Sequence, residues 1–202
     1  MVTTQAKPPL RIMLVDDDPK RAGWVEQCLN EMGFDTCAVV GNAMHVLKVI
    51  SEVAPDVIII DMDSPGRDIL ESLTILAAHQ PTPVVMFSDE EDPDFIRRAV
   101  DAGVSTYLVG GIDPVKVEPI IEIAMAQFRS FQQLKTALDE TRLELSERHT
   151  VDKAKRILMR SHDLSEARAF AYLRGQAMDC GARIADIAQR VIKLSESGGI
   201  EN

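Results

Sequence analysis

Five short apolar runs alternate with five amphipathic stretches along the first 128 residues, and this alternation constrains the fold most. Apolar runs of about 4–8 residues between turn-forming residues are typical of strands buried in a parallel sheet. The repeat predicts an α/β fold with a doubly wound, five-stranded parallel sheet and right-handed crossovers. Strands are expected at 11–15, 35–40, 57–60, 83–87 and 105–109, and helices near 19–32, 42–53, 66–79, 92–102 and 114–128.

Two of these runs end on carboxylates. Asp16, Asp17 and Asp18 follow the first run, whereas the third ends at Asp61, with Asp63 two positions further on. Because parallel strands share their carboxyl ends, these acids are expected to meet in the crevice where open α/β sheets bind ligands. Grouped carboxylates repel one another unless a cation lies among them, and oxygen ligands suit Mg²⁺. The sequence therefore predicts a magnesium-dependent acidic pocket.

A long helix is predicted beyond this domain, because neither proline nor glycine interrupts residues 120–148. Steps of three and four residues place five side chains on one seam of period 3.5, which is typical of a dimerising coiled coil. An amphipathic helix that lies on its own domain is the alternative. The seam consists of Phe131, Leu134, Leu138, Thr141 and Leu145.

Helical patterns near 140–160, 165–179 and 181–195 predict a small three-helix bundle at the C-terminal end. We therefore expect three parts: a domain at 9–128, a coiled-coil linker helix at 129–147 and a helical domain at 148–195. The residues expected in the core of the bundle are Ala154, Ile157, Leu158, Ala169, Phe170, Leu173, Ala177, Ile184, Ile187 and Val191.

Charge is distributed unevenly, although the net charge of the chain is −10. Residues 1–129 hold 10 basic and 21 acidic side chains, whereas residues 147–183 hold 8 basic and 5 acidic ones. A basic tract on an acidic carrier fits an output domain that meets an anionic partner. No apolar run approaches the roughly 20 residues of a membrane span. The three cysteines form no CxxC pair, so free thiols in a reducing cytoplasm are expected.

The first domain resembles the receiver domain of two-component response regulators. The acids carry this resemblance, together with the turn Asp61-Met62-Asp63-Ser64-Pro65-Gly66, Ser88 at the end of the fourth strand and Tyr107 in the fifth. The resemblance implies that Asp61 accepts a phosphoryl group, that Asp16, Asp17, Asp61 and the backbone carbonyl of Asp63 bind Mg²⁺, and that Ser88 and Tyr107 act in the switch.

One departure from the receiver pattern concerns the fifth strand. The family usually has a Lys-Pro dipeptide after this strand, whereas here Gly110 and Gly111 follow Val109. A charge-assisted contact of the kind that the lysine makes is worth roughly 1.5–3 kcal/mol. We therefore expect a poorly stabilised phosphorylated state. The alternative is a receiver that serves mainly as a binding and dimerisation platform.

The C-terminal segment resembles the ANTAR domain of transcription antiterminators. The matching residues are Ala154-Lys155, Leu158-Met159, Ser165-Glu166, Ala169-Phe170, Leu173-Arg174 and Ala177-Met178. The resemblance implies binding of RNA hairpins in nascent leader transcripts, usually by a dimer.

Basic side chains on the predicted helices could contact RNA phosphates. Lys153, Arg156 and Arg160 share one helix face, Lys155 lies on an adjoining one, and the resemblance adds Arg174. The alternative is a solvated face that interacts with the acidic domain. Phosphotransfer through a lone histidine is disfavoured, because His149 and His162 lack a suitable context.

The combined architecture most resembles NasT-type regulators of nitrate and nitrite assimilation. The resemblance implies a non-enzymatic cytoplasmic regulator, with a sensor kinase or a nitrate-binding sensor protein as partner. A protein-binding adaptor and a DNA-binding regulator remain as alternatives, although the helix at 181–195 is a poor recognition helix.

Overall fold

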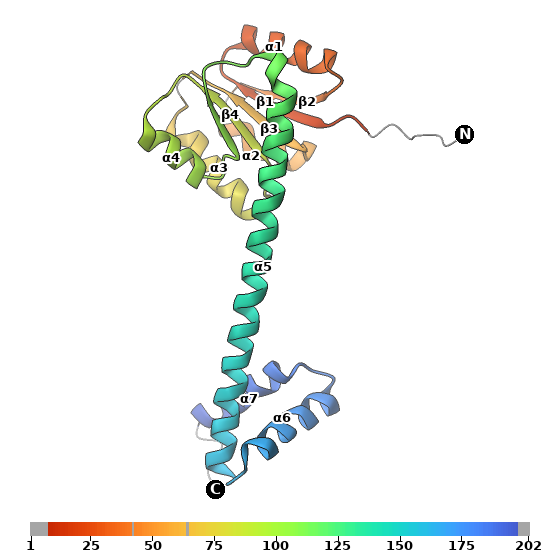
Figure 1. Cartoon of the computed structure of the whole chain (residues 1–202), viewed down its shortest axis with the longest axis vertical. Coiled ribbons are helices and arrows are strands. Elements are labelled where there is room, and N and C mark those ends of the chain that lie inside the picture. Colours follow the sequence, from red (N-terminus) through yellow and green to blue (C-terminus); the bar gives the residue numbers. More distant parts are fainter. Residues whose placement is uncertain (1–7, 42, 64, 198–202) are drawn as a thin grey trace, which may run out of the picture. The chain divides into compact units, whose positions relative to one another are not determined.

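The structure is a computed structural model that describes residues 8–41, 43–63 and 65–197 (Figure 1). Ser64 of the predicted turn lies outside the described residues, and so does the side chain of Pro114. The chain forms two compact units, residues 1–132 and 133–202. The strands are β1 (Arg11–Asp16), β2 (Asp35–Val40), β3 (Val57–Asp61), β4 (Val84–Ser88) and β5 (Thr106–Val109). The helices are α1 (Pro19–Glu31), α2 (Ala43–Val53), α3 (Arg67–His79), α4 (Pro93–Asp101), α5 (Pro114–Ser161), α6 (Glu166–Cys180) and α7 (Ile184–Glu196).

The five strands form one parallel sheet in the order β2-β1-β3-β4-β5. This confirms the predicted doubly wound α/β fold. The order reverses direction after β1, so β1 and β3 flank the switch point where such sheets bind ligands. Asp16 at the end of β1 pairs in register with Asp61 at the end of β3. The pairing brings the two acids to the same edge of the sheet, as the sequence predicts.

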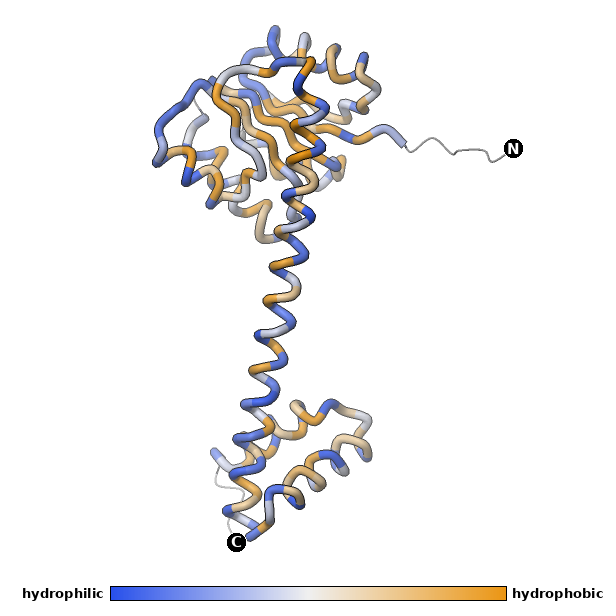
Figure 2. The backbone as a smooth tube through the Cα atoms, in the orientation of Figure 1, coloured by the Kyte–Doolittle hydropathy of each residue, from blue (hydrophilic) through white to orange (hydrophobic). Residues whose placement is uncertain are grey.

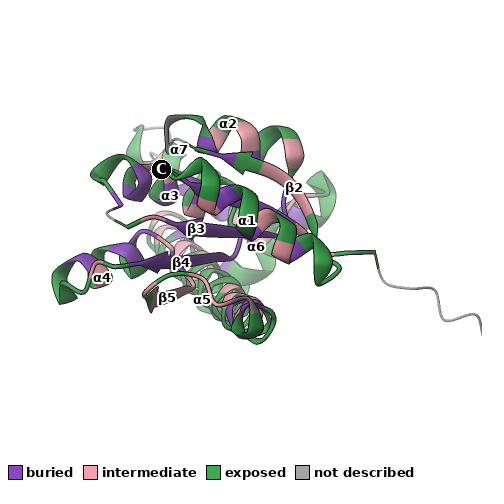
Figure 3. Ribbon diagram, turned by 90° about the horizontal axis from the view of Figure 1, so that it is seen from above, coloured by how far each residue is buried: buried purple, intermediate pink, exposed green. Residues whose placement is uncertain are grey.

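Two apolar layers cover the faces of the sheet. One face packs against α2, α3 and α4, and the other against α1 and the first turns of α5. The strands are apolar along most of their length (Figure 2), and β3 and β4 are buried throughout (Figure 3). Burial on both faces explains why these strands read as continuous apolar runs instead of alternating ones.

Local signals set the beginnings of α1 and α4. Asp18 caps α1 by accepting from the backbone N–H groups of Lys20 and Arg21, and Asp92 caps α4 by accepting from the N–H of Asp94. Proline occupies the first helical position in both cases, where its missing N–H has no partner to lose. The caps fix where α1 begins and therefore which of its side chains face the acidic edge.

The second unit contains the C-terminal part of α5 together with α6 and α7. Its core is made by nine buried residues: Ala154, Leu158, Ala169, Leu173, Ala177, Ile187, Ala188, Val191 and Ile192. The prediction that Phe170 lies in this core is wrong, because its side chain is 42% exposed. None of the helices in the described parts of the chain is both long and apolar enough to cross a membrane.

Candidate functional sites

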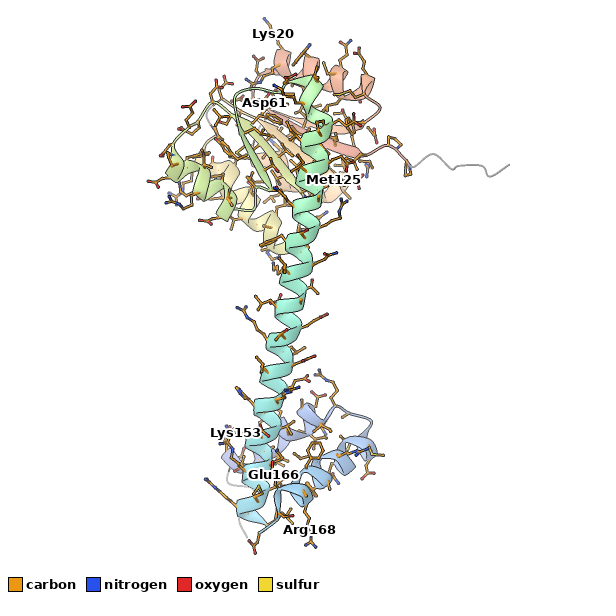
Figure 4. The ribbon with its side chains drawn as sticks, in the orientation of Figure 1. Lys20, Asp61, Met125, Lys153, Glu166 and Arg168 are labelled. Atoms are coloured by element: carbon orange, nitrogen blue, oxygen red, sulfur yellow. The ribbon has the colours of Figure 1, made fainter. Side chains whose placement is uncertain are left out.

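The acidic pocket lies at the carboxyl edge of the sheet (Figure 4). Asp16 and Asp61 are 1% and 2% exposed, whereas Asp17 and Asp63 reach solvent. The pKa of the Asp61 carboxyl is raised to about 6, chiefly by burial and also by Asp16 and Asp63, while Arg21 opposes the shift. The Asp61 Oδ2 atom accepts no hydrogen bond. The pocket therefore holds a buried carboxylate with one oxygen that lacks a hydrogen bond.

A guanidinium group fills the space between these acids. Arg21 projects from the first turn of α1 and is only 23% exposed. Its Nη2 atom lies 2.9 Å from Asp16 Oδ1 and 3.0 Å from Asp17 Oδ1, and its Nε lies 3.4 Å from Asp61 Oδ2. Its Nη1 also pairs with Asp63 Oδ1. All four predicted metal-binding residues thus surround one cation of the chain itself.

Hydrogen bonds to these acids, Asp16 foremost, raise the pKa of Arg21, which keeps the guanidinium charged. Sequence reasoning did not single out this residue. The sequence feature that could have identified Arg21 is its position five residues after Asp16 and four after Asp17, in a helix whose start is fixed by Asp18. Spacing alone could not reveal that the side chain also reaches Asp61 and Asp63, which are 40 and 42 positions away.

The donor chemistry of the pocket suits Mg²⁺, since carboxylate and carbonyl oxygens are hard ligands. Within the described residues, however, no group of three or more acidic, histidine or cysteine side chains is arranged to hold a metal ion. Arg21 lies among these acids, and its N–H groups donate to carboxylate oxygens of Asp16 and Asp17. The pocket can therefore hold a cation, but its centre is already occupied by a side chain.

The predicted switch residues lie beside the pocket. Ser88 is 2% exposed, and its Oγ donates to the backbone carbonyl of Asp63 at 3.2 Å. Tyr107 is half-buried, donates its hydroxyl to the Glu90 carbonyl at 2.8 Å and meets the edge of Phe95. Ser88 thus connects the acidic edge to the segment between β4 and α4, and Tyr107 contacts the same segment at Glu90.

The missing lysine has a conformational counterpart at Gly110. This residue has φ = +96°, a left-handed conformation that side chains other than glycine rarely adopt. Its N–H donates to the Ser88 carbonyl at 2.9 Å, which closes the end of the sheet. A lysine here would be strained, and the positive charge that lies among the acids belongs to Arg21 of α1.

The second candidate site is a basic surface on the helical unit. The predicted RNA-binding residues fall into two groups there. Lys153 pairs with Glu196 at 2.9 Å, and Lys155 pairs with Asp152 at 2.7 Å and with Glu166 at 2.8 Å. Because these lysines tie α5 to α7 and α6, their charges are partly neutralised within the unit.

The arginines form the other group. Arg156, Arg160 and Arg174 are exposed and make no ion pair with any acid in the described part of the chain. Arg168, which sequence reasoning did not single out, is also exposed, and its side chain extends outward from α6 (Figure 4). These four arginines are among the charges that the unit leaves available to an anionic partner.

Two aromatic side chains accompany Arg168 and Arg174 on α6. Phe170 is 42% exposed and Tyr172 is 49% exposed, so both rings present surface to solvent. Tyr172 lies one turn beyond Arg168, and Arg174 lies one turn beyond Phe170. Phe170 also lines an open groove of about 700 Å³ together with Val151 and Ile184. The surface therefore combines free cations with aromatic faces on one helix.

Comparison with known proteins bears on both units. The model of the response regulator receiver domain matches residues 12–122, and the ANTAR domain model matches residues 132–192. The transcriptional regulatory protein PdtaR of Mycobacterium tuberculosis is 26% identical over 185 residues, which cover 92% of this chain and 90% of that protein. The DNA-binding response regulator MtrA of Mycolicibacterium smegmatis is 29% identical over 119 residues, which cover 59% of this chain and half of that protein.

Solved structures resemble the first unit. The receiver domain of the response regulator NarL from Mycobacterium tuberculosis matches with a TM-score of 0.53 and 21% identity, over 58% of this chain and 98% of that one. The receiver domain of a modulated diguanylate cyclase from Desulfovibrio desulfuricans G20 matches with the same TM-score and identity, over 60% of this chain and 97% of that one. At this identity the likeness establishes the fold of the sheet and its helices.

Proposed function

Because this chain belongs to the response regulator family and carries an ANTAR domain after its receiver domain, we propose that it is a transcription antitermination regulator. In this proposal the ANTAR domain binds hairpins of nascent leader mRNA, and the receiver domain controls that binding. We place the receiver at 9–128, the linker helix at 129–147 and the ANTAR domain at 148–195. Neither matching family model describes an enzymatic domain, and we propose a cytoplasmic regulator without a turnover reaction.

The observation that carries the proposal is the set of unpaired arginines beside exposed rings on the helical unit. Sequence-specific RNA recognition uses unstacked bases, which stack on aromatic side chains or on arginine planes. Phe170, Tyr172 and the nearby arginines offer both kinds of surface. The paired lysines Lys153 and Lys155 contribute less in this proposal, because each would have to leave an acid first.

Control by the receiver is the second part of the proposal. Asp61 accepts a phosphoryl group, and Ser88 and Tyr107 respond to it through their contacts with the Asp63 and Glu90 carbonyls. Bound Mg²⁺ would offset the charge of the transferred phosphoryl oxygens, held by Asp16, Asp17, Asp61 and the Asp63 carbonyl. A sensor protein that binds the receiver directly is the alternative input, motivated by Gly110 where the family has lysine.

We also propose that the regulator is a homodimer joined by a coiled coil along α5. The apolar residues of the predicted seam are exposed: Phe131 is 64%, Leu134 72%, Leu138 49% and Leu145 51% accessible. Exposed apolar side chains at heptad spacing are stabilised when a second helix covers them. The pattern of the chain around Asp61 and Gly110 supports a role in nitrate or nitrite assimilation, with a sensor kinase or a nitrate-binding sensor protein as partner.

RNA binding is tested by mobility shift with a pool of RNA hairpins and with duplex DNA of matched sequence, at several salt concentrations. We expect preferential binding to hairpins. The double variant Arg156→Gln/Arg160→Gln should weaken binding and flatten the dependence of log K on log salt by about 0.7–0.9 for each lost phosphate contact. Arg97→Gln in the receiver is the matched control. Binding to duplex DNA alone, or to neither, would contradict the proposal.

Receiver control is tested separately with acetyl phosphate and Mg²⁺. We expect treatment to raise the RNA affinity of the wild type and to leave that of Asp61→Asn unchanged. An equal response of both proteins would exclude Asp61 as the phosphoacceptor. No response in either protein would favour control by a sensor protein.

A further inference from the structure

Arg21 lies among the four acids that are expected to bind Mg²⁺. Its three guanidinium nitrogens contact Asp16, Asp17, Asp61 and Asp63, which come from the ends of two strands and the turns after them. The Nη2 atom also donates to the Asp61 carbonyl at 3.1 Å. One side chain therefore contacts all four of these acids and uses all three nitrogens of its planar group.

The charges of the pocket remain unbalanced with Arg21 in place. Four carboxylates surround one guanidinium, and no lysine follows β5 to add a second positive charge. Asp61 Oδ2 is buried and accepts no hydrogen bond, although Arg21 Nε lies 3.4 Å away as its ion-pair partner. These two observations indicate that the pocket retains attraction for a further or stronger cation.

Arg21 is well suited to give way to such a cation. Its side chain is held only by ion pairs and hydrogen bonds to the acids, and it reaches solvent with 23% of its surface. Asp16 stays fixed without it, because this carboxylate also accepts from the Asp18 N–H at 2.8 Å. Movement of the guanidinium would thus expose a preformed set of oxygens.

We infer that Arg21 is the resident counter-ion of the acidic pocket and that a divalent cation binds there only by displacing the Arg21 guanidinium. This inference rests on the Mg²⁺ site of the proposed function and is independent of RNA binding. The chain supplies the first cation of its receiver from α1.

The test compares Mg²⁺ binding by the full-length wild type with binding by Arg21→Met, using MgCl₂ and isothermal titration calorimetry. Loss of one charge-assisted competitor should tighten Mg²⁺ binding about tenfold or more. Arg21→Lys keeps a charge without the fork and should lie between the two. Lys20→Met is the matched control. It removes a charge from the same helical turn, but the Lys20 side chain points away from the pocket (Figure 4).

Thermal unfolding supplies a second readout that does not depend on calorimetry. In EDTA, Arg21→Met should melt below the wild type, because four acids then lack any cation. Added Mg²⁺ should raise the melting temperature of the variant more than that of the wild type. Trp24, the single tryptophan, lies one turn beyond Arg21 on α1 and reports unfolding of this unit.

Two outcomes would overturn the inference. Equal Mg²⁺ affinities of wild type and Arg21→Met would exclude displacement while leaving the proposed Mg²⁺ site intact. Absence of Mg²⁺ binding in both proteins would remove the inference and the proposed Mg²⁺ site together. Neither outcome affects the proposed RNA binding, which has its own assay.

Discussion

Replacement of Asp61 by asparagine should stabilise the receiver at neutral and alkaline pH. Burial raises the pKa of this carboxyl from 3.8 to about 6, so the folded state holds a proton that the unfolded chain has already released. The free energy of unfolding therefore falls as the pH rises between these two values. Above pH 6 the folded protein bears the full cost of a charged, buried Asp61. Asparagine carries no charge and avoids that cost.

The magnitude follows from the size of the shift. A displacement of about 2 pKa units corresponds to about 3 kcal/mol at 1.36 kcal/mol per unit. The attraction of Arg21, which opposes the shift, is already included in it. We expect Asp61→Asn to exceed the wild type in free energy of unfolding by about 3 kcal/mol at pH 8 and by less than about 1 kcal/mol at pH 4.

Urea unfolding followed by Trp24 fluorescence measures this difference in EDTA at constant ionic strength. Asp101→Asn is the control, because this acid is exposed at the end of α4 and its replacement should change stability little at either pH. A difference between Asp61→Asn and wild type that stays constant from pH 4 to pH 8 would refute the reasoning. A variant that is less stable at pH 8 would refute it as well.

Three further substitutions test other parts of the structure. Leu173→Ala empties a fully buried position of the helical core and should cost about 2–5 kcal/mol, measured by urea denaturation of the helical signal in circular dichroism. Gly110→Lys should destabilise the receiver by about 1–2 kcal/mol, because φ is +96° at this position. An unchanged melting temperature would show that lysine is tolerated there without strain. Tyr107→Phe removes the hydroxyl that donates to the Glu90 carbonyl and should lower the free energy of unfolding in urea by about 1 kcal/mol. An unchanged urea midpoint would show that this hydrogen bond does not stabilise the fold.

The sheet could be predicted from the sequence because its central strands β1, β3 and β4 are buried on both faces. A continuous apolar run such as Val57–Ile60 has no polar face that could lie in solvent, which indicates a strand covered on both sides. Asp18 and Asp92 mark the starts of helices because their side chains accept hydrogen bonds from the first turn. The convergence of Asp16 and Asp61 followed from parallel pairing alone. These features depend on local chemistry and on one topological rule.

The identity of the pocket cation and the exposure of Phe170 could not be predicted in the same way. Arg21 reads locally as an ordinary basic residue in the first turn of a helix, and its contacts with Asp61 and Asp63 exist only once β3 lies beside β1. Phe170 lies beside buried Ala169 in a helical pattern, but whether its ring is covered depends on how α6 sits against α5 and α7. Both cases need tertiary packing that periodicity does not contain.

Read-through of a terminator is the measurement that tests the central claim most directly. A hairpin selected for binding is placed before an intrinsic terminator, and single-round transcription with purified polymerase is run with and without the protein. We predict that the wild type raises the fraction of full-length transcript, whereas Arg156→Gln/Arg160→Gln does so much less at equal concentration. Read-through that the wild type leaves unchanged, despite binding the hairpin, would contradict antitermination as the function of this chain.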